Sequence, residues 1–352
     1  MVLRGGTSKG AYFLAEDLPD ASAERDDLLL RVMGSPDAKQ IDGIGGGHPL
    51  TSKVAVIRRS GEPDIDVDYL FLQVHVDAPR VSAEQPCGNI LAGVGPFAIE
   101  RDLVAPTGAM TPVRIRMVNT GAVAVVHVPT PGGQVEYAGT TAIDGVPGTA
   151  ARLVIDFRDT AGSVAPALLP TGNVIDDVDG LSATLIDNGM PVAIVAAAAL
   201  GVTGYETPAE LENDTALCRR VETFRLEAGK LMGLGDVATT TVPKICIVAS
   251  PAAGGSLATR MFIPHRVHTS IGVLAAVTVA TAAVIEGSAA AGVYRSIGDV
   301  VRLEHPTGWF DAVVDVTTGP NGIHIGRSAI VSTARLLLDG TVHPRPRDGE
   351  PA

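Results

Sequence analysis

Aromatic residues are scarce in this chain of 352 residues, because Phe, Trp and Tyr together make up 4% of it, whereas 40 residues are glycine. A core built from large rings is therefore excluded, and we expect small side chains, tight turns and closely packed backbone. Cysteine is scarce as well, with only Cys87, Cys218 and Cys246. Three widely spaced cysteines form no disulfide framework and favour a reducing compartment, so we expect a cytoplasmic protein.

Positive charge is also in deficit, because 39 acidic residues outnumber 27 Lys and Arg and leave a formal net charge of −12. Nucleic acids and anionic membrane surfaces are therefore not expected partners. The longest apolar run, residues 271–285, contains threonines and is shorter than the roughly 20 residues that span a bilayer. No signal peptide is apparent. A small-molecule ligand is the expected partner, and a homodimer is left open.

The length of the chain predicts two domains, because it is too long for one ordinary core. The Pro- and Gly-bearing stretch 165–173 marks the predicted boundary, with domains over 1–165 and 166–352. Two helices of small apolar residues, predicted over 90–100 and 273–286, each follow a turn with a small polar residue and a glycine. This similarity predicts two similar domains, each pointing a helix N-terminus at a shared cleft that holds the active site.

The segment PCGNILAGVGPFAIE, residues 86–100, places a thiol at the start of the first apolar helix. Cys87 and Gly88 are predicted to form a tight corner, with Asn89 as the N-cap. Unpaired N–H groups and the helix dipole would stabilise a thiolate there and would attract a carboxylate or an enolate. A buried structural cysteine is the alternative, since free cysteine is among the most buried residue types.

A glycine loop near the N-terminus, RGGTSKG, begins at Arg4 and contains Ser8 and Lys9. It is not a Walker A loop, because the order Gly-Lys-Ser/Thr is absent. Its backbone N–H groups and its lysine would still suit an anion, and a plain turn with a solvated lysine is the alternative.

A second loop, QIDGIGGGHPLTSK, repeats the Thr-Ser-Lys sequence and ends at Ser52 and Lys53. Its four glycines between positions 43 and 47 have no evident packing purpose, which predicts that the backbone approaches a ligand closely. Lys53 stands directly before a predicted strand, 54–57, where partial burial would make it a usable base. An exposed lysine at a strand edge is the alternative.

The stretch of the second half that corresponds to the Cys87 segment is MFIPHRVHTSIG. It carries Arg266 between His265 and His268 and then reaches Ser270 and Gly272. The two histidines have a metal-like spacing, but no carboxylate or third histidine is near them in sequence, so zinc is not predicted. Arg266 is the better candidate, as a clamp for a carboxylate.

Taken together, these motifs resemble the PrpF-type isomerases, and the resemblance covers almost the whole chain. It rests on RGGTSKG (4–10), IDGIGG (41–46), TSKV (51–54), CGN with VGPF (87–97) and LLPTG (168–172). The resemblance implies a diaminopimelate-epimerase-like α+β fold, with two similar domains, each a sheet or barrel wrapped around a central apolar helix. It also leaves open a start upstream of Met1, because the family has a fuller first strand. IDNGMPV (186–192) and FIPHRVHTSIG (262–272) are most similar to the 4-oxalomesaconate tautomerases of gallate catabolism.

The resemblance implies cofactor-independent keto–enol tautomerisation of an unsaturated tricarboxylate, without a metal. It makes Lys53 the main acid–base residue and Cys87 its partner across the substrate. Where epimerases of this fold carry a second cysteine, this chain has Thr269 and Ser270, which argues against a two-thiol racemase. The candidate substrate-binding residues are Arg4, Ser8, Lys9, Ser52, Gly88, Asn89, Arg266, Ser270 and Gly272.

Three other functions stay open at this point. The same fold could isomerise 2-methylaconitate or aconitate between cis and trans forms. It could also move the double bond of oxalomesaconate, since both reactions use the same base and enolate. A non-catalytic carboxylate-binding protein is the rival from a different class, and an exposed Lys53 remote from Cys87 would favour it.

Overall fold

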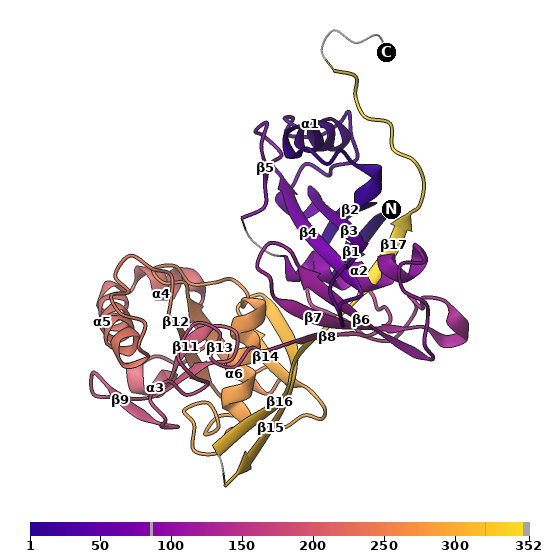
Figure 1. Cartoon of the computed structure of the whole chain (residues 1–352). Helices are drawn as coiled ribbons and strands as arrows, with labels where there is room; N and C mark the ends of the chain where they lie inside the picture. Colours follow the sequence, from indigo (N-terminus) through magenta and orange to yellow (C-terminus); the bar gives the residue numbers. More distant parts are fainter. Residues whose placement is uncertain (85–86, 321, 348–352) are drawn as a thin grey trace. The chain divides into compact units, whose positions relative to one another are not determined.

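A computed structural model describes residues 1–84, 87–320 and 322–347 of the chain. The chain forms two compact units, which Figure 1 shows in sequence colours. Unit 1 comprises residues 1–158 and 332–352, and unit 2 comprises residues 159–331. These units differ from the predicted domains, because the boundary lies seven residues earlier (158 rather than 165) and the end of the chain belongs to unit 1.

Two sets of contacts explain this difference. The buried carboxylate of Asp187 accepts hydrogen bonds from the backbone N–H groups of Val164 at 2.7 Å and Ala165 at 2.8 Å, which ties the predicted linker to unit 2. The last strand, β17 (Ala334–Leu338), pairs antiparallel with the first, β1 (Val2–Gly5), and so returns the chain to unit 1. Neither contact leaves a local signal in the sequence.

Unit 1 is a sheet that surrounds the apolar helix α2 (Gly88–Glu100), which contacts six of its other strands and β17. The remaining elements of unit 1 are β2 (Ser8–Leu14), η1 (Ala15–Asp17), α1 (Ser22–Met33), η2 (Pro49–Thr51), β3 (Lys53–Arg59), β4 (Val67–Val74), β5 (Val81–Ser82), β6 (Met110–Met117), β7 (Val123–Pro129), η3 (Pro131–Gly133) and β8 (Leu153–Phe157).

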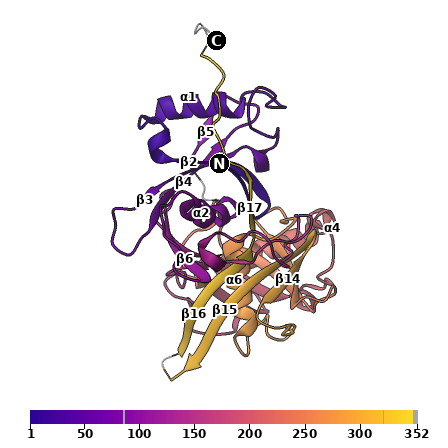
Figure 2. The ribbon, with the colours of Figure 1, turned by 90° about the vertical axis from the view of Figure 1, so that its right-hand side faces the viewer.

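Helix α2 occupies the centre of unit 1 because it is apolar on every side, and such a helix is stable only when it is buried. Two of its glycines allow the strands to come close. A Cβ at Gly93 would lie 2.3 Å from the hydroxyl oxygen of Tyr12, and one at Gly95 would lie 2.8 Å from Val128. Helix α1 packs on the opposite face of β2, β3 and β4 (Figure 2). Leu29 and its neighbours form a second apolar cluster there.

Unit 2 surrounds the apolar helix α6 (Val273–Val284) in the same way. Its other elements are β9 (Asp176–Val178), β10 (Leu181–Asp187), β11 (Pro191–Ala196), α3 (Ala197–Leu200), α4 (Pro208–Asn213), α5 (Thr215–Leu231), β12 (Lys244–Ala249), β13 (Leu257–Phe262), β14 (Val301–His305), β15 (Gly308–Gly319) and β16 (Gly322–Ser332).

The two units repeat one topology. In unit 1 the pairs β1–β2, β3–β4, β6–β7 and β7–β8 are antiparallel, and β2–β3 and β4–β6 are parallel. Strands β10 to β16 repeat this series of pairings in the same order. Helices α2 and α6 occupy equivalent places, each before the strand that enters the sheet in parallel. The predicted α+β, diaminopimelate-epimerase-like fold with two similar halves is confirmed.

Polar side chains around α6 are hydrogen-bonded to one another. The amide nitrogen of Asn188 donates to Thr281 at 2.7 Å and to Ser328 at 2.9 Å, and Thr160 donates to the amide oxygen of Asn188 at 2.6 Å. These groups are buried, and their mutual bonds offset the cost of removing them from water. In the described part of the chain, every helix is too short or too polar to cross a bilayer.

Candidate active site

The sheet of unit 1 presents one face of β2 and β3 to the first turn of α2. The hydroxyl of Tyr12 donates to the backbone oxygen of Ile90 at 2.7 Å. Because side chains alternate along a strand, Ser8 and Gly10 lie on this face too. Gly10 pairs with Lys53 in the parallel register, so the side chain of Lys53 also points to the α2 side. The glycine is required there, since its Cβ would lie 2.7 Å from the Lys53 oxygen.

Lys53 is buried, with 8% of its surface exposed, and its amine is held in one place. Its Nζ donates to Oε1 of Gln73 at 2.8 Å and lies 5.1 Å from the ring centre of Phe71. The amide nitrogen of Gln73 is fixed in turn by a 2.8 Å hydrogen bond to the backbone oxygen of Ser52. The alternative of an exposed strand-edge lysine is therefore excluded. Sequence reasoning missed Gln73, although an antiparallel register sets it directly opposite Lys53.

Cys87, and not Asn89, is the N-cap of α2, so the predicted cap is wrong. The backbone of Cys87 is extended, and its carbonyl accepts the hydrogen bond from the N–H of Leu91 at 3.0 Å. The side chain of Asn89 is used elsewhere, because its Oδ1 accepts from the N–H of Thr7 at 3.3 Å. This bond joins the RGGTSKG loop to the first turn of α2. The half-buried thiol thus lies at the N-terminal end of α2, which we call the mouth of the helix.

The start of α2 differs from those of α4 and α5, and α1, α3 and α6 resemble α2 in having no capping side chain among the described residues. The N-terminal N–H groups of α4 and α5 are capped by the side chains of Thr207 and Asp214. At α2, no side chain of the described residues caps the N-terminus, and Gly88 supplies the first of its helical N–H groups. Uncapped N–H groups at the positive end of a helix form a binding site for an anion.

The hydroxyl groups of two buried tyrosines, Tyr12 and Tyr69, lie next to backbone oxygens at the start of α2. Burial raises the pKa of both Tyr12 and Tyr69 well above the ordinary value, and the nearby Cys87 raises it further. Both phenols are therefore neutral donors at physiological pH. Tyr69 lies on the same face of β4 as Gln73, and its hydroxyl oxygen is 3.5 Å from the backbone oxygen of Cys87. Sequence reasoning missed both tyrosines, because their contacts depend on the strand register.

Ser8 is the predicted residue whose environment points most clearly to a ligand. Its side chain is 2% exposed, and its hydroxyl has no hydrogen-bond partner among the described residues. A buried hydroxyl without a partner costs about 1–3 kcal/mol. Ser52 is different, because its hydroxyl donates to the backbone oxygen of Val74 at 2.8 Å and accepts from Gln40 at 2.7 Å. Ser52 therefore stabilises the start of β3, whereas the hydroxyl of Ser8 is available to bond a ligand.

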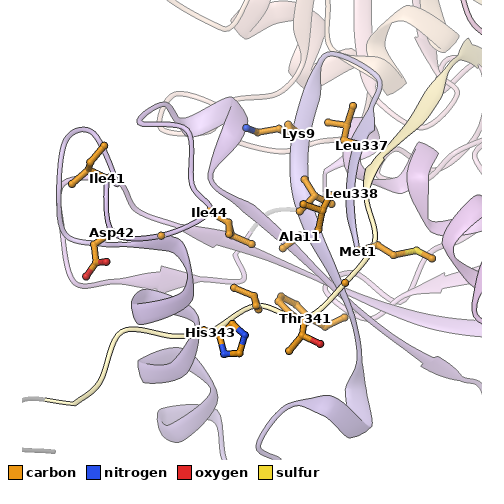
Figure 3. A pocket seen from close by; sticks show the side chains of 15 residues that line it. Met1, Lys9, Ala11, Ile41, Asp42, Ile44, Leu337, Leu338, Thr341 and His343 are labelled. Carbon is orange, nitrogen blue, oxygen red and sulfur yellow. The ribbon is translucent and has the colours of Figure 1, made fainter. Parts of the chain in front are cut away.

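Lys9 lies on the other face of β2, away from α2. It shares that face with Ala11 and Phe13, and together they line a cavity of about 570 Å³ with Ile41 and Asp42 (Figure 3). The structure therefore does not bring Lys9 together with Lys53. The two Thr-Ser-Lys sequences are identical, but the side chains of their lysines lie on opposite faces of the sheet.

Arg4 braces the RGGTSKG loop. Its guanidinium donates to the backbone oxygen of Gly6 at 2.9 Å and to the backbone and hydroxyl oxygens of Thr333 at 3.0 and 2.9 Å. Burial lowers the pKa of Arg4, and the positive charge of Arg335 lowers it further. The side chain thus joins the loop to the segment before β17.

The glycine loop over 43–47 does have a packing purpose, which corrects the expectation of a close approach to a ligand. A Cβ at Gly45 would lie 2.1 Å from the amide oxygen of Gln40, and one at Gly46 would lie 2.4 Å from the hydroxyl of Thr51. The buried Gln40 side chain fills the loop from inside. Small residues are needed there to let the loop close on Gln40.

In unit 2, the exposed side chain of Arg266 forms an ion pair with Glu212. Its side chain is 79% exposed, and its Nε donates to Glu212 at 2.9 Å. The backbone N–H of Val267 also donates to Glu212, at 2.8 Å, and these contacts lower the pKa of Glu212. Arg266 therefore ties the turn after β13 to α4, in place of the expected open clamp.

Ser270 and Gly272 lie at the mouth of α6. Gly272 is the N-cap, and no side chain within the described ranges caps this helix either. The N–H of Ser270 donates to Nδ1 of His268 at 2.9 Å, and its hydroxyl oxygen is 3.0 Å from Nε2 of His305. Burial lowers the pKa of His268, and the positive charge of Lys244 lowers it further. Sequence reasoning missed His305, which is 35 residues away.

The candidate site of unit 1 consists of the buried amine of Lys53 and the hydroxyl of Ser8 on the α2 face of the sheet, and of the thiol of Cys87 at the start of α2. Amines and thiols in such surroundings act as acids and bases, and the uncapped helix can stabilise a developing anion. Among the described residues, no cluster of three or more His, Cys, Asp or Glu is arranged to hold a metal ion. This face therefore carries groups that are suited to proton transfer.

The chain belongs to the PrpF family, because residues 1–345 match the family model described as PrpF protein. It is 59% identical over 345 residues to the 4-oxalomesaconate tautomerase of Pseudomonas putida, a match that covers 97% of this chain and 94% of that protein. It is 56% identical over 345 residues to the (4E)-oxalomesaconate Delta-isomerase of a Novosphingobium species, with 97% and 96% covered. The expectation that the chain is an isomerase is confirmed.

A solved structure shows the same fold. The crystal structure of methylitaconate-delta-isomerase superposes with a TM-score of 0.85 at 35% identity, and the match covers 96% of this chain and 93% of that one. The fold of this chain is therefore shared with an enzyme that is named for methylitaconate. The choice of substrate must depend on side chains that the fold alone does not determine.

Proposed function

We propose that this protein is a 4-oxalomesaconate tautomerase that interconverts the keto and enol forms of an unsaturated tricarboxylate. The proposal combines the 59% identity to a tautomerase of that name with the groups on the α2 face of unit 1. It extends to a role in gallate or protocatechuate-type catabolism and to a cytoplasmic location, which the three widely spaced cysteines favour.

The observation that carries the proposal is the placement of Lys53. Its amine is buried on the face that α2 covers, and Gln73 and Phe71 fix its position. A general base must be held within reach of the proton that it takes, and a fixed amine meets this condition. A non-catalytic carboxylate-binding protein would need a charged patch but no such oriented amine.

The chemistry follows from these groups. Lys53 takes a proton from the carbon next to the carbonyl, and Cys87 acts on the opposite side as its acid–base partner. The uncapped N–H groups at Gly88 and Asn89 stabilise the enolate charge, and the hydroxyl of Ser8 donates to a substrate carboxylate. Each step is a proton transfer between side chains and substrate, so the reaction requires no metal or organic cofactor.

A second candidate is supported by the 56% identity to a (4E)-oxalomesaconate Delta-isomerase. Movement of the double bond uses the same base and the same enolate, and the proton returns to a different carbon. In this case Lys53 and Cys87 would act in sequence on two carbons of the conjugated system. The same residues therefore serve either reaction.

An ultraviolet time course with 4-oxalomesaconate, repeated in heavy water with detection by NMR, separates the two candidates. Fast interconversion of the keto and enol forms, without a shift of the carbon–carbon double bond, is the expected result. Deuterium beside a shifted double bond would establish the Delta-isomerase instead. If neither form changes and 2-methylaconitate or an aconitate reacts, the proposed substrate is wrong.

A further inference from the structure

The cavity of about 570 Å³ lies on the face of the unit 1 sheet that points away from α2 (Figure 3). Its lining comes from strands β1, β2 and β17, from the loop over 41–44 and from residues 340–343, all of which belong to unit 1. Neither Lys53 nor Ser8 is among its lining residues, because both side chains lie on the α2 face. The cavity is therefore separate from the candidate active site.

Most of the cavity lining is apolar. Four of its residues also belong to, or pack against, the apolar cluster that contains Leu29, namely Ala11, Phe13, Ile44 and Val342. Three more apolar side chains, those of Ile41, Leu337 and Leu338, line the cavity and are exposed, Ile41 by 83%. Single exposed apolar side chains are ordinary, but a group of them around a cavity marks a binding site. A cavity of this volume is within the range that holds small organic molecules.

A row of positive charge borders this apolar surface. The strand register sets Arg335 of β17 directly opposite Arg4 of β1, and Arg4 directly opposite Lys9 of β2. Directly opposed residues of neighbouring strands lie on one face of the sheet, so the three cationic side chains form a row across three strands. Val2 and Ala11, each two positions along its strand from this row, line the cavity. The cationic row therefore lies beside the apolar lining.

Within residues 1–84, 87–320 and 322–347, no carboxylate pairs with any member of this row. Nη1 of Arg4 donates to oxygens of Gly6 and Thr333, which are uncharged. Burial and then the positive charge of Arg335 lower the pKa of Arg4. Like charges that lie directly opposite each other on two strands are destabilising, so this row is repulsive until an anion neutralises it.

Lys9 is the member of the row that reaches the cavity. Its half-buried side chain is a lining residue, whereas Arg4 and Arg335 are not. Figure 3 shows the amine of Lys9 well separated from Asp42 and His343, with Ala11 between them. Asp42 and His343 are exposed to solvent. The cavity thus has an ammonium group at one end and apolar side chains along its middle.

We propose that this cavity binds a small apolar monocarboxylate, whose carboxylate pairs with Lys9 and whose hydrocarbon part fills the apolar lining. Arg4 and Arg335 add positive potential at the carboxylate end. One ammonium group that reaches the cavity suits one carboxylate, whereas a tricarboxylate would bring two further charges onto apolar surface. The inference goes beyond the proposed tautomerase activity and does not depend on it.

Isothermal titration calorimetry on the full-length protein tests this site, with octanoate and naphthoate as the probes. The two probes share the carboxylate and differ in the apolar part, so they show whether a chain or a ring system fits better. We expect a submillimolar Kd for at least one of them. In the series from butanoate to octanoate, each methylene that enters the cavity should tighten binding by about fourfold. Octylamine, which has the opposite charge, should bind far more weakly than octanoate.

Three variants locate the bound carboxylate. Lys9→Met removes the charge and keeps the apolar stem, and it should weaken binding of the carboxylates by about 10- to 100-fold. Arg335→Met removes a more distant charge from an exposed side chain and should weaken binding only a few-fold. The matched control Lys39→Met removes an exposed lysine that does not line the cavity, and it should leave the Kd nearly constant. Melting temperatures show that each variant is folded.

Absence of binding by both probes at millimolar concentration would overturn the inference. Equal affinities for octanoate and octylamine, or equal losses in Lys9→Met and Lys39→Met, would overturn it as well.

A second copy of the chain is the other occupant that the exposed Leu337 and Leu338 could accept. Sedimentation of the wild type and of Leu338→Asp tests this alternative. A dimer that Leu338→Asp separates, without binding of either probe, would assign the surface to self-association and overturn the inference. Failure of the wild type to act on 4-oxalomesaconate would overturn the proposed function and leave this site unaffected.

Discussion

The mouths of α2 and α6 are equivalent in topology and different in chemistry. Both helices lack a side-chain cap within the described residues, and each precedes the strand that enters the sheet of its unit in parallel. At α2 the cap is Cys87, on the face that holds the oriented amine of Lys53. At α6 the cap is Gly272, with Ser270 bonded to His305. One architecture thus presents two chemically different helix N-termini.

The largest effect is expected at the α2 mouth itself. Cys87→Ala should lower turnover by about 100- to 10,000-fold, the range for loss of a general acid or base, with little change in the melting temperature. Steady-state kinetics and a thermal melt measure both. Ser270→Cys, which gives the α6 mouth a thiol, should not restore activity to Cys87→Ala, and recovery there would show that the two mouths are interchangeable.

The three cysteines sharpen this comparison. Burial raises the pKa of Cys246 well above its ordinary value, and burial with the charge of Asp214 raises that of Cys218. Iodoacetamide should therefore modify Cys87 first, and substrate should protect it. Peptide mass spectrometry after brief alkylation locates the modified thiol. Preferential modification of Cys218 would contradict the placement of the reactive thiol at α2.

A smaller effect is expected from Gln73, the residue whose side chain accepts a hydrogen bond from the amine of Lys53. Gln73→Leu removes the acceptor that orients the amine and should lower kcat by about tenfold, with KM nearly constant. A parallel rise in KM would indicate general loosening of β4 instead.

Two buried serines of unit 1 should respond in opposite ways to removal of the hydroxyl. Ser8→Ala removes an unpartnered group, so the free energy of unfolding should stay constant or rise by up to about 1 kcal/mol, while KM rises. Ser52→Ala breaks bonds to Val74 and Gln40 and should lower stability by about 1–3 kcal/mol. Denaturant unfolding compares them. Equal destabilisation would contradict the assignment of Ser8 to the ligand.

The smallest effect concerns the α6 mouth and pH. The pKa of His268 is lowered in the folded state, so the unfolded chain binds the proton more tightly. Its contribution to stability is fully present above the unfolded value near pH 6.5 and is lost as the pH falls through that value towards the folded one. Protonated Nδ1 can no longer accept from the N–H of Ser270.

His268→Asn keeps an acceptor for the Ser270 N–H and removes the titration. Its melting temperature should therefore depend less on pH between about 6.5 and 5 than that of the wild type. Melting curves at matched ionic strength measure this difference. A steeper pH dependence in the variant would contradict the sign of the effect.

Much of the fold was predictable from the sequence, because apolar helices in small-residue surroundings and repeated turns are local features. The helix mouth at Cys87 and the strand that starts at Lys53 follow from such features. The return of β17 to β1 was not predictable, since no local pattern shows which strand will pair with another over such a distance.

The site was predictable for residues that belong to motifs and less so for their partners. Gln73 and His305 contact Lys53 and Ser270 only through the register of the strands and the path of the chain. Lys9 was expected to bind substrate, but strand alternation sends its side chain to the face away from α2 and from Lys53. The glycines of 43–47 were misinterpreted because the buried Gln40, which they accommodate, has no motif of its own.

The most direct test of the account is deuterium uptake at carbon by 4-oxalomesaconate in heavy water, measured by NMR with Lys53→Met and with the control Lys9→Met. Both variants remove a lysine from a Thr-Ser-Lys sequence of unit 1, but only Lys53 lies on the α2 face. The account predicts that Lys53→Met abolishes enzymatic uptake while it still binds substrate, and that Lys9→Met exchanges nearly as fast as the wild type. Wild-type exchange by Lys53→Met would contradict it.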